Sequence, residues 1–463
     1  MGKAMKVGNK DGFGAVKRKD GWLRAKIGQV CIISTICIIC IICFICFICF
    51  ICIICGVGCG SKGLEKMQSA EGEVTGGGNG TGAGCAGEEG NRAESGWTGE
   101  EGGHAEAVGG GGTEEGKETD TSKQIAETYR DIYEKAAGEG KLSSLETIQD
   151  IVDRLGEEGY CAIDMENENQ VNLTHPEKIE EFCSLVELGK KGEETIISIM
   201  EDGGFIRFDL ETVHGEVFVT RSVLQWKGGM PEVDYMNRYP ACEWEFSGNG
   251  YLFFRKKVPQ GYDGDQGYTA IRVYPLEDEC RELNRKYILP IGYNANQAFL
   301  LDWTEEELKG LDFDDLFSKL YNSTFGKPLP YEQTIDGTSY LVPEEEYEKV
   351  ILSHFRMDKE TLRAYGNYRE KDRAYEYRSR GFNDCASSPN NPYPEVTACE
   401  RQEDGTWKLT VNAVWPIENM DKAFSHEVVV RVLEDGGFQY VSNRVIPDED
   451  NAEPTWYTER AVK

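Results

Sequence analysis

The chain has 463 residues, of which 40% are hydrophobic and 11% aromatic, enough for a sizeable core in one large domain or two ordinary ones. The formal net charge is −31. With eight Lys/Arg and two Asp, residues 1–59 carry +6, so residues 60–463 carry −37. So acidic a body argues against DNA or RNA as a partner, because no basic surface is available to release counterions from phosphates.

An apolar segment near the N-terminus predicts a membrane tether. Residues 30–55 contain no charge, and as a helix they would extend about 39 Å, against roughly 30 Å for the hydrocarbon core of a bilayer. Residues 1–29 are basic, whereas the chain after the apolar segment is acidic. The positive-inside rule therefore places residues 1–29 in the cytoplasm and the globular part outside it.

The apolar segment ends in Gly56-Val57-Gly58-Cys59, which resembles the lipobox of bacterial lipoproteins. In that motif a small residue precedes a cysteine that receives a lipid before the signal peptide is cleaved. Gly56 departs from the leucine that usually stands three residues before the cysteine. Two interpretations stay open, a lipid attached to Cys59 and an uncleaved transmembrane helix over 30–55. Both predict the same location, the cell membrane.

The segment that follows predicts a disordered stalk. Residues 60–120 contain twenty Gly and thirteen Asp/Glu in 61 positions. Such a composition cannot bury enough apolar area to offset the entropy of ordering the chain. We therefore expect residues 122–463 to form the globular region, with a subdivision near residue 275 or residue 340.

Three helices are expected at the start of this region. Apolar residues recur at helical spacing from Ser122, and a second helix follows the capping box formed by Ser143 and Glu146. A third begins at Thr174. The pattern then changes to short runs rich in Ile, Val, Phe, Tyr and Trp, broken by glycine turns, which predicts antiparallel hairpins. These strands are expected over 194–200, 204–210, 216–227, 242–247 and 250–257.

Helices are predicted again after residue 275, and the chain ends in two β-hairpins. The helices are expected near 276–286, 304–310, 312–321 with Asp312 as its cap, 343–355 and 358–365. The hairpin strands are expected near 395–402, 406–415, 425–434 and 438–446. Helices, then a meander, then helices and hairpins define an α+β fold, with helices packed on antiparallel sheets.

Three stretches of this region resemble a known family. They are CRELNRKYILP at 280–290, YEYRSRGF at 375–382 and GFQYVSN at 437–443. They are similar to a family of uncharacterised predicted lipoproteins from clostridia-type bacteria, over residues 122–457. The resemblance implies a bacterial cell-surface location and no assigned activity.

No catalytic, metal-binding or cofactor motif is recognisable, and no cofactor or metal is expected. Carboxylates crowd one stretch, and paired acids can hydrolyse glycosides. Each of them also falls at a predicted helix start, where acids cap the helix and complement its dipole. These residues are Asp302, Glu305, Glu306, Glu307, Asp312, Asp314 and Asp315.

The local cluster of Tyr375, Tyr377, Arg378 and Arg380 is the candidate ligand-binding surface. On a strand, exposed tyrosine rings can stack on a sugar, and paired arginines can bind a carboxylate. The alternative is an edge strand whose arginines offset nearby acids.

Six cysteines lie in the globular part: Cys161, Cys183, Cys242, Cys280, Cys385 and Cys399. Outside the cytoplasm they can form disulfides, but a domain of this size needs no cysteine framework, which favours six small buried apolar residues. For the whole protein we expect a non-enzymatic surface protein that binds a ligand or partner or serves the envelope structurally. The alternative is a glycan-directed envelope hydrolase that uses two carboxylates.

Overall fold

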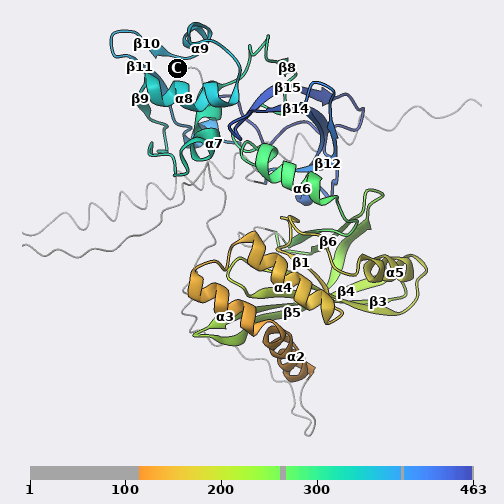
Figure 1. Ribbon diagram of the computed structural model, residues 1–463. Helices are drawn as coiled ribbons and strands as arrows, with labels where there is room; N and C mark the ends of the chain where they lie inside the picture. Colours follow the sequence, from red (N-terminus) through yellow and green to blue (C-terminus); the bar gives the residue numbers. More distant parts are fainter. Residues whose placement is uncertain (1–113, 261–266, 387–389, 461–463) are drawn as a thin grey trace, which may run out of the picture. The chain divides into compact units, whose positions relative to one another are not determined.

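The computed structural model describes residues 114–260, 267–386 and 390–460, which belong to one compact unit (Figure 1). The basic segment 1–29, the apolar segment 30–55, Cys59 and the stalk up to residue 113 lie outside the described residues. Within the described part, no helix is both long and apolar enough to cross a bilayer.

The first part of the unit is built on a seven-stranded sheet whose strands follow one another in sequence order. Only the β1–β2 pair is parallel, because a helix connects these strands, and the other pairs are antiparallel neighbours. The predicted antiparallel hairpins are therefore confirmed, but the strand expected over 242–247 begins at Met230, and the first and last strands of the sheet were not expected. The strands are β1 (Cys161–Asp164), β2 (Gly192–Ile199), β3 (Phe205–Val213), β4 (Glu216–Lys227), β5 (Met230–Phe246), β6 (Tyr251–Lys256) and β7 (Tyr268–Arg272).

Helices cover both faces of this sheet. Side chains alternate along a strand, so Ile196 packs against α5 (Pro176–Glu187) while Ile197 packs on the opposite face against α2 (Glu114–Thr128) and α4 (Leu145–Glu157). The short helix α3 (Arg130–Glu139) connects α2 to α4. Alternating apolar positions thus build two cores, one on each side of the sheet.

Three predicted helix starts are wrong. Helix α5 begins at Pro176, after His175, instead of at Thr174, whose hydroxyl instead donates to the backbone carbonyl of Tyr160 at 2.7 Å. Helix α2 begins at Glu114 instead of Ser122, because Arg207 on β3 forms an ion pair with Glu118 at 2.7 Å and holds the extra turns against the sheet. Helix α4 is capped by Ser144 instead of Ser143, since the Ser144 hydroxyl accepts the Thr147 amide hydrogen at 3.2 Å.

The second part contains a five-stranded antiparallel sheet in the order β12-β13-β14-β15-β8. Its two hairpins turn at Asp404-Gly405 and Asp435-Gly436-Gly437, where Gly405 and Gly436 have positive φ, a conformation that glycine adopts without strain. The strands are β12 (Tyr393–Arg401), β13 (Trp407–Val414), β14 (Ser425–Val432), β15 (Phe438–Ile446) and the edge strand β8 (Trp303–Thr304).

Helices and a small sheet pack on this second sheet around one large hydrophobic core. The helices are α6 (Asp278–Leu283), continued by a π-helical turn at Asn284–Ile288, α7 (Phe313–Phe325), α8 (Glu344–His354) and α9 (Lys359–Tyr365), with 3₁₀ turns at Phe382–Asp384 and Pro416–Glu418. The small sheet has the order β10-β11-β9, formed by Tyr368–Arg369, Ala374–Arg378 and Ser339–Pro343.

The described residues therefore form an α+β fold, as expected, with helices packed on antiparallel sheets (Figure 1). One predicted helix, 304–310, is absent. Trp303 and Thr304 instead pair with Asn443 and Ser442 of β15, which draws the segment into the sheet edge. The boundaries proposed near residues 275 and 340 stay predictions.

Candidate functional site

The amino end of helix α7 gathers three of the carboxylates that the sequence analysis singled out. Asp312 caps the helix, since its Oδ1 accepts the backbone N–H groups of Asp314 at 3.0 Å and Asp315 at 3.1 Å. This confirms the predicted cap. Three acids within one turn also complement the positive end of the helix dipole.

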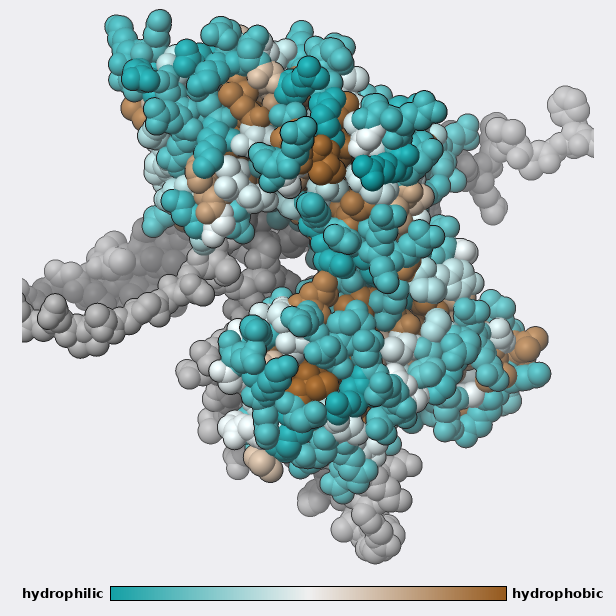
Figure 2. Space-filling model, in the orientation of Figure 1, coloured by the Kyte–Doolittle hydropathy of each residue, from teal (hydrophilic) through white to brown (hydrophobic). Residues whose placement is uncertain are grey.

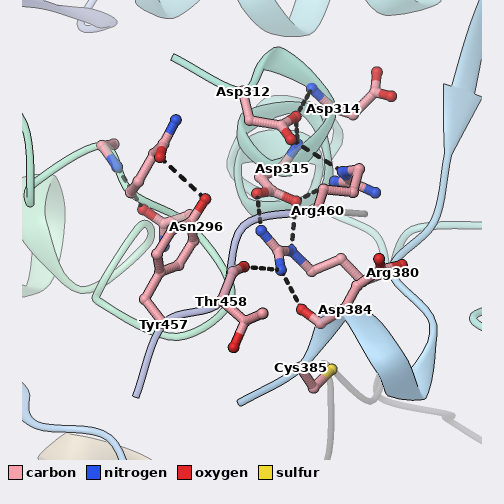
Figure 3. Close-up of polar contacts among 12 residues, drawn as sticks. Asn296, Asp312, Asp314, Asp315, Arg380, Asp384, Cys385, Tyr457, Thr458 and Arg460 are labelled. Atoms are coloured by element: carbon pink, nitrogen blue, oxygen red, sulfur yellow. Dashed lines mark hydrogen bonds and ion pairs between the residues drawn. The ribbon is translucent and has the colours of Figure 1, made fainter. Parts of the chain in front are cut away.

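Asp315 and Arg380 form a buried, bidentate ion pair (Figure 3). The guanidinium Nε and Nη2 atoms donate to the two carboxylate oxygens at 2.9 and 2.6 Å, and the two side chains are only 3% and 2% exposed. Arg380 also donates to the backbone carbonyls of Asp384 and Thr458 and lies 5.3 Å from the centre of the Tyr457 ring. The arginine thus joins α7, the segment after β11 and the C-terminal segment.

A second arginine, Arg460, completes the charge balance at the helix start. Its Nε donates to Asp312 at 3.0 Å, and its Nη2 pairs with Asp315 (Figure 3). Two carboxylates therefore face two guanidinium groups, and their charges cancel. Burial by itself lowers the pKa of Arg380, but the hydrogen bond and the charge of Asp315 outweigh it and hold the pKa above its ordinary value.

Asp314 is the third carboxylate, and neither of these arginine side chains hydrogen-bonds to it among the contacts of the described residues. Its oxygens accept hydrogen bonds from the Tyr347 hydroxyl at 3.0 Å and from the Arg378 backbone N–H at 3.1 Å. Burial, with the charge of Asp312 as the next cause, raises the pKa of Asp314 to about 6. This carboxyl therefore keeps its proton to a higher pH than an ordinary aspartate does.

The predicted ligand-binding cluster lies in the protein interior, so the exposure expected of its tyrosines is wrong. Tyr375 and Tyr377 are each 1% exposed. Tyr375 stacks on Tyr347, with ring centres 4.3 Å apart, and Tyr377 packs against Phe317. The strand is also not an edge, because β11 pairs with β10 on one side and β9 on the other.

The two arginines of the cluster contact acids of the protein itself. Arg380 pairs with Asp315, as described above, and the Arg378 guanidinium lies 3.0 Å from Asp384. Tyr375, Tyr377 and Arg380 thus cannot reach a ligand at the surface without rearrangement of the core.

A pocket of about 340 Å³ opens beside this charge network. Asp312, Asp314, Tyr347 and Arg460, which belong to or contact the charge network, are among its lining residues. The end of α9 and the residues after it also line the pocket. The remaining lining residues are Gln297, Gly310, Leu311, Phe313, Tyr365, Gly366 and Asn367. The volume lies at the lower end of the range typical of small-molecule sites.

Tyr365 is the exposed aromatic residue of this pocket. Its ring is 46% exposed, and it stacks on Phe313 with the ring planes 19° apart and the centres 5.9 Å apart. No hydrogen bond to the Tyr365 hydroxyl or the Asn367 side-chain amide is formed within the part of the chain that the structure describes. The pocket therefore combines an aromatic ring, positioned by its stacking on Phe313, with hydrogen-bonding groups that are available to a ligand.

Sequence reasoning missed both Tyr365 and Arg460. Tyr365 follows the buried Leu362 by three residues on α9, so helical spacing assigns it to the same buried face. Arg460 lies in a C-terminal stretch without periodicity, and its partners are 145 and 148 residues away in the chain.

The other carboxylates of the crowded stretch do not join the pocket lining. Glu305 pairs with Arg431 at 2.8 and 3.0 Å, and Asp302 accepts the backbone N–H of Val445 at 2.7 Å. Both contacts hold β8 and its flanks against the large C-terminal sheet. Because the expected helix 304–310 is absent, these acids do not act as helix caps there; their partners come from β14 and β15.

Two larger or comparable hollows are less suited to a small ligand. A groove of about 910 Å³ lies on the seven-stranded sheet, but its charged side chains pair with one another, as Arg207 does with Asp209 and Arg238 with Glu211. A hollow of about 320 Å³ lies near Tyr235 and Tyr268, and its charged lining residues Arg221 and Glu166 pair with each other at 3.0 Å.

These features define an α+β protein with hydrophilic residues over much of the face in Figure 2 and with a small polar–aromatic pocket. Residues 115–460 match the model of a family of unknown function (DUF6070), and the chain belongs to that family. No curated protein and no solved structure matches the chain.

Proposed function

We propose that this protein is tethered to a bacterial cell membrane and uses its globular part, outside the cytoplasm, to bind a ligand without chemical conversion. The apolar segment 30–55 and its basic flank support the tether, and Gly58-Cys59 supports a lipid anchor as its form. The three stretches that resemble predicted clostridial lipoproteins support the same location. Residues 1–113 lie outside the described residues, so this part of the proposal rests on the sequence.

The ligand class follows from the pocket at the start of α7. Sugar rings present weakly apolar faces and many hydroxyl groups, so sites that bind them need an aromatic face together with amide and carboxylate groups. The exposed Tyr365 ring beside Asp312 and Asn367 supplies this combination, and it is the observation that carries the proposal. We therefore propose an oligosaccharide as the ligand. This pocket replaces Tyr375 and Tyr377 as the proposed sugar-binding surface.

The geometry supports binding more strongly than hydrolysis. A glycoside hydrolase needs one carboxylic acid that protonates the leaving oxygen and one carboxylate that acts as base or nucleophile. Asp312 is held by the α7 amides and Arg460, and both oxygens of Asp314 accept hydrogen bonds. Only the pKa of Asp314, about 6, favours the enzymatic alternative.

The binding test uses the full chain in detergent micelles and a panel of neutral and acidic oligosaccharides. Tyr365→Ala should weaken the binding of a hit about tenfold, which corresponds to about 1.4 kcal/mol, because it removes the ring on which a sugar stacks. Tyr235→Ala is the matched control, since Tyr235 is 42% exposed but lines the hollow on the other sheet. Equal loss in both variants, or loss only in the control, would reject the pocket as the site.

The same samples distinguish binding from hydrolysis. If the bound oligosaccharides are cleaved, and if Asp314→Asn abolishes cleavage while retaining affinity, the enzymatic alternative replaces the proposal. For the tether, protease added to intact cells should remove the globular part, and Cys59→Ala should abolish lipid labelling. Protection of the globular part until the cells are lysed would overturn the location outside the cytoplasm.

A further inference from the structure

Two cysteines that are far apart in the sequence meet where helix α6 packs on strand β12. Cys280 lies in the first turn of α6 and is 2% exposed, whereas Cys399 lies on β12 and is partly exposed. Their Sγ atoms are 3.2 Å apart, although the residues are separated by 119 positions. The α6–β12 contact therefore places two thiols within reach of each other, and one of them is accessible to a reagent in solution.

Carboxylates surround the two thiols. The ligand atoms of Glu277, Cys280 and Cys399 all lie within 4.8 Å of one another, and Glu279 Oε2 lies 3.9 Å from Cys399 Sγ. Burial, together with Cys399 and the two glutamates, raises the pKa of Cys280 to about 12. The thiolate form of Cys280 is therefore unfavourable here unless a cation neutralises its charge or the sulfur forms a covalent bond.

The distances favour a covalent bond over a metal ion. Two thiolates bound to tetrahedral zinc lie about 3.8 Å apart, because each Zn–S bond is about 2.3 Å long. The two Sγ atoms here are closer than that, and a shift of roughly 0.6 Å by each would bring them to the length of a disulfide, about 2.05 Å. Among the described residues, only the ligand atoms of Glu277, Cys280 and Cys399 all lie within 4.8 Å of one another, whereas a structural zinc site uses four ligands.

We propose that Cys280 and Cys399 form a disulfide bond that links helix α6 covalently to strand β12. The oxidant is a low-molecular-weight disulfide. The Cys399 thiolate attacks one of its sulfurs and releases one thiolate, which gives a mixed disulfide on Cys399. The Cys280 thiolate then attacks the Cys399 sulfur and releases the second thiolate. The two cysteines lose two protons and two electrons, and the oxidant is reduced to two thiols.

The bond closes a long loop between the part of the chain before α7 and the C-terminal sheet. Cross-linking residues that are 119 positions apart restricts the unfolded chain, so the oxidised protein should be more stable than the reduced one. The proposal is independent of the oligosaccharide pocket, because none of its residues lines that pocket. Failure of one proposal therefore leaves the other untouched.

The test is peptide mapping of the full chain in detergent micelles after equilibration with oxidised glutathione. Free thiols are alkylated under denaturing conditions, and the protein is digested with trypsin without reduction. We expect peptides 273–281 and 381–401 to be linked and two hydrogens lighter than their sum. Reduction should separate them and lower the melting temperature by roughly 4–8 °C.

Trypsin leaves Cys385 and Cys399 in one peptide, so variants must assign the bond. Cys399→Ser should lose the linked peptide and the dependence of the melting temperature on reduction, whereas Cys385→Ser should retain both. A linked peptide that survives in Cys399→Ser but disappears in Cys385→Ser would overturn the assignment. So would unlinked peptides at equilibrium, or stoichiometric zinc in the purified protein that is lost in Cys399→Ser.

Discussion

Replacing Arg380 by methionine would leave the Asp315 carboxylate buried beside α7 with Arg460 as its only arginine partner among the described contacts. The substitution keeps most of the apolar volume but removes both charged hydrogen bonds of the pair. It also removes the donors to the carbonyls of Asp384 and Thr458. The helix start, the segment after β11 and the C-terminal segment would thereby lose one of the side chains that join them, while Arg460 would still contact the helix start.

The expected loss follows from burial. Breaking one side of a buried pair typically costs about 3–5 kcal/mol, because a charge remains without its partner in a medium of low dielectric constant. Both side chains of this pair are almost fully buried, but Arg460 still contacts Asp315 and compensates for part of the loss. We therefore expect Arg380→Met to lower the free energy of unfolding by about 3 kcal/mol, far more than an exposed binding arginine would.

The assay is urea unfolding followed by the fluorescence of the eight tryptophans. Arg356→Met is the matched control, because its side chain is 69% exposed and lies 3.8 Å from Glu305; the expected loss is below about 1 kcal/mol. The slope of the free energy against urea should not change, so that the midpoints can be compared. Equal losses in the two variants would refute the buried-pair reasoning.

A double-mutant cycle separates the pair from the rest of the network. In Asp315→Asn combined with Arg380→Met, the loss should be smaller than the sum of the single losses by at least about 1 kcal/mol, because the second change removes the charge that the first left unpaired. Additive losses would show that Arg380 acts mainly through Thr458 and Asp384.

Three further predictions concern single groups. Burial raises the pKa of Asp314 to about 6, so the native state loses stability as pH rises from about 4 to about 6. Asp314→Asn should therefore gain about 1–3 kcal/mol at pH 7 and little at pH 4 in unfolding curves, and a gain independent of pH would contradict this. Burial lowers the pKa of His426 to about 4, so its contribution is present above about pH 6.5 and is lost as pH falls towards 4. The wild type should lose about 3 kcal/mol more over this window than His426→Gln, whose amide can still reach Tyr293 and Asn443; identical pH profiles would exclude a buried neutral imidazole. Finally, Ser144→Ala should cost about 1 kcal/mol and Ser143→Ala less than about 0.5 kcal/mol in thermal melts, and the reverse order would assign the cap of α4 to Ser143.

Much of the local structure could be predicted from the sequence because its determinants are close in the chain. The Asp312 cap acts over three residues, and the turns at Gly405 and Gly436 need only a residue that tolerates positive φ. Periodicity of apolar residues likewise predicted α4 and the four strands of the C-terminal hairpins. The prediction of a helix over 304–310 was wrong because Trp303 and Thr304 pair with the edge of β15, a strand that is remote in the sequence.

The candidate site was decided by contacts between remote segments. Alternation on β11 shows that neighbouring side chains face opposite ways, but it does not show which faces are covered. Tyr375 is buried because Tyr347 of α8 stacks on its ring. The Arg380 guanidinium, which the sequence analysis proposed as a ligand contact, instead pairs with Asp315, 65 positions earlier in the chain. The same folding left Tyr365 exposed beside Asp312 and brought Cys280 to Cys399. Composition and spacing show which types of side chain are present and how they alternate. Which of them are buried, and which groups they pair with, depends on residues that are distant in the chain and come into contact only in the folded core.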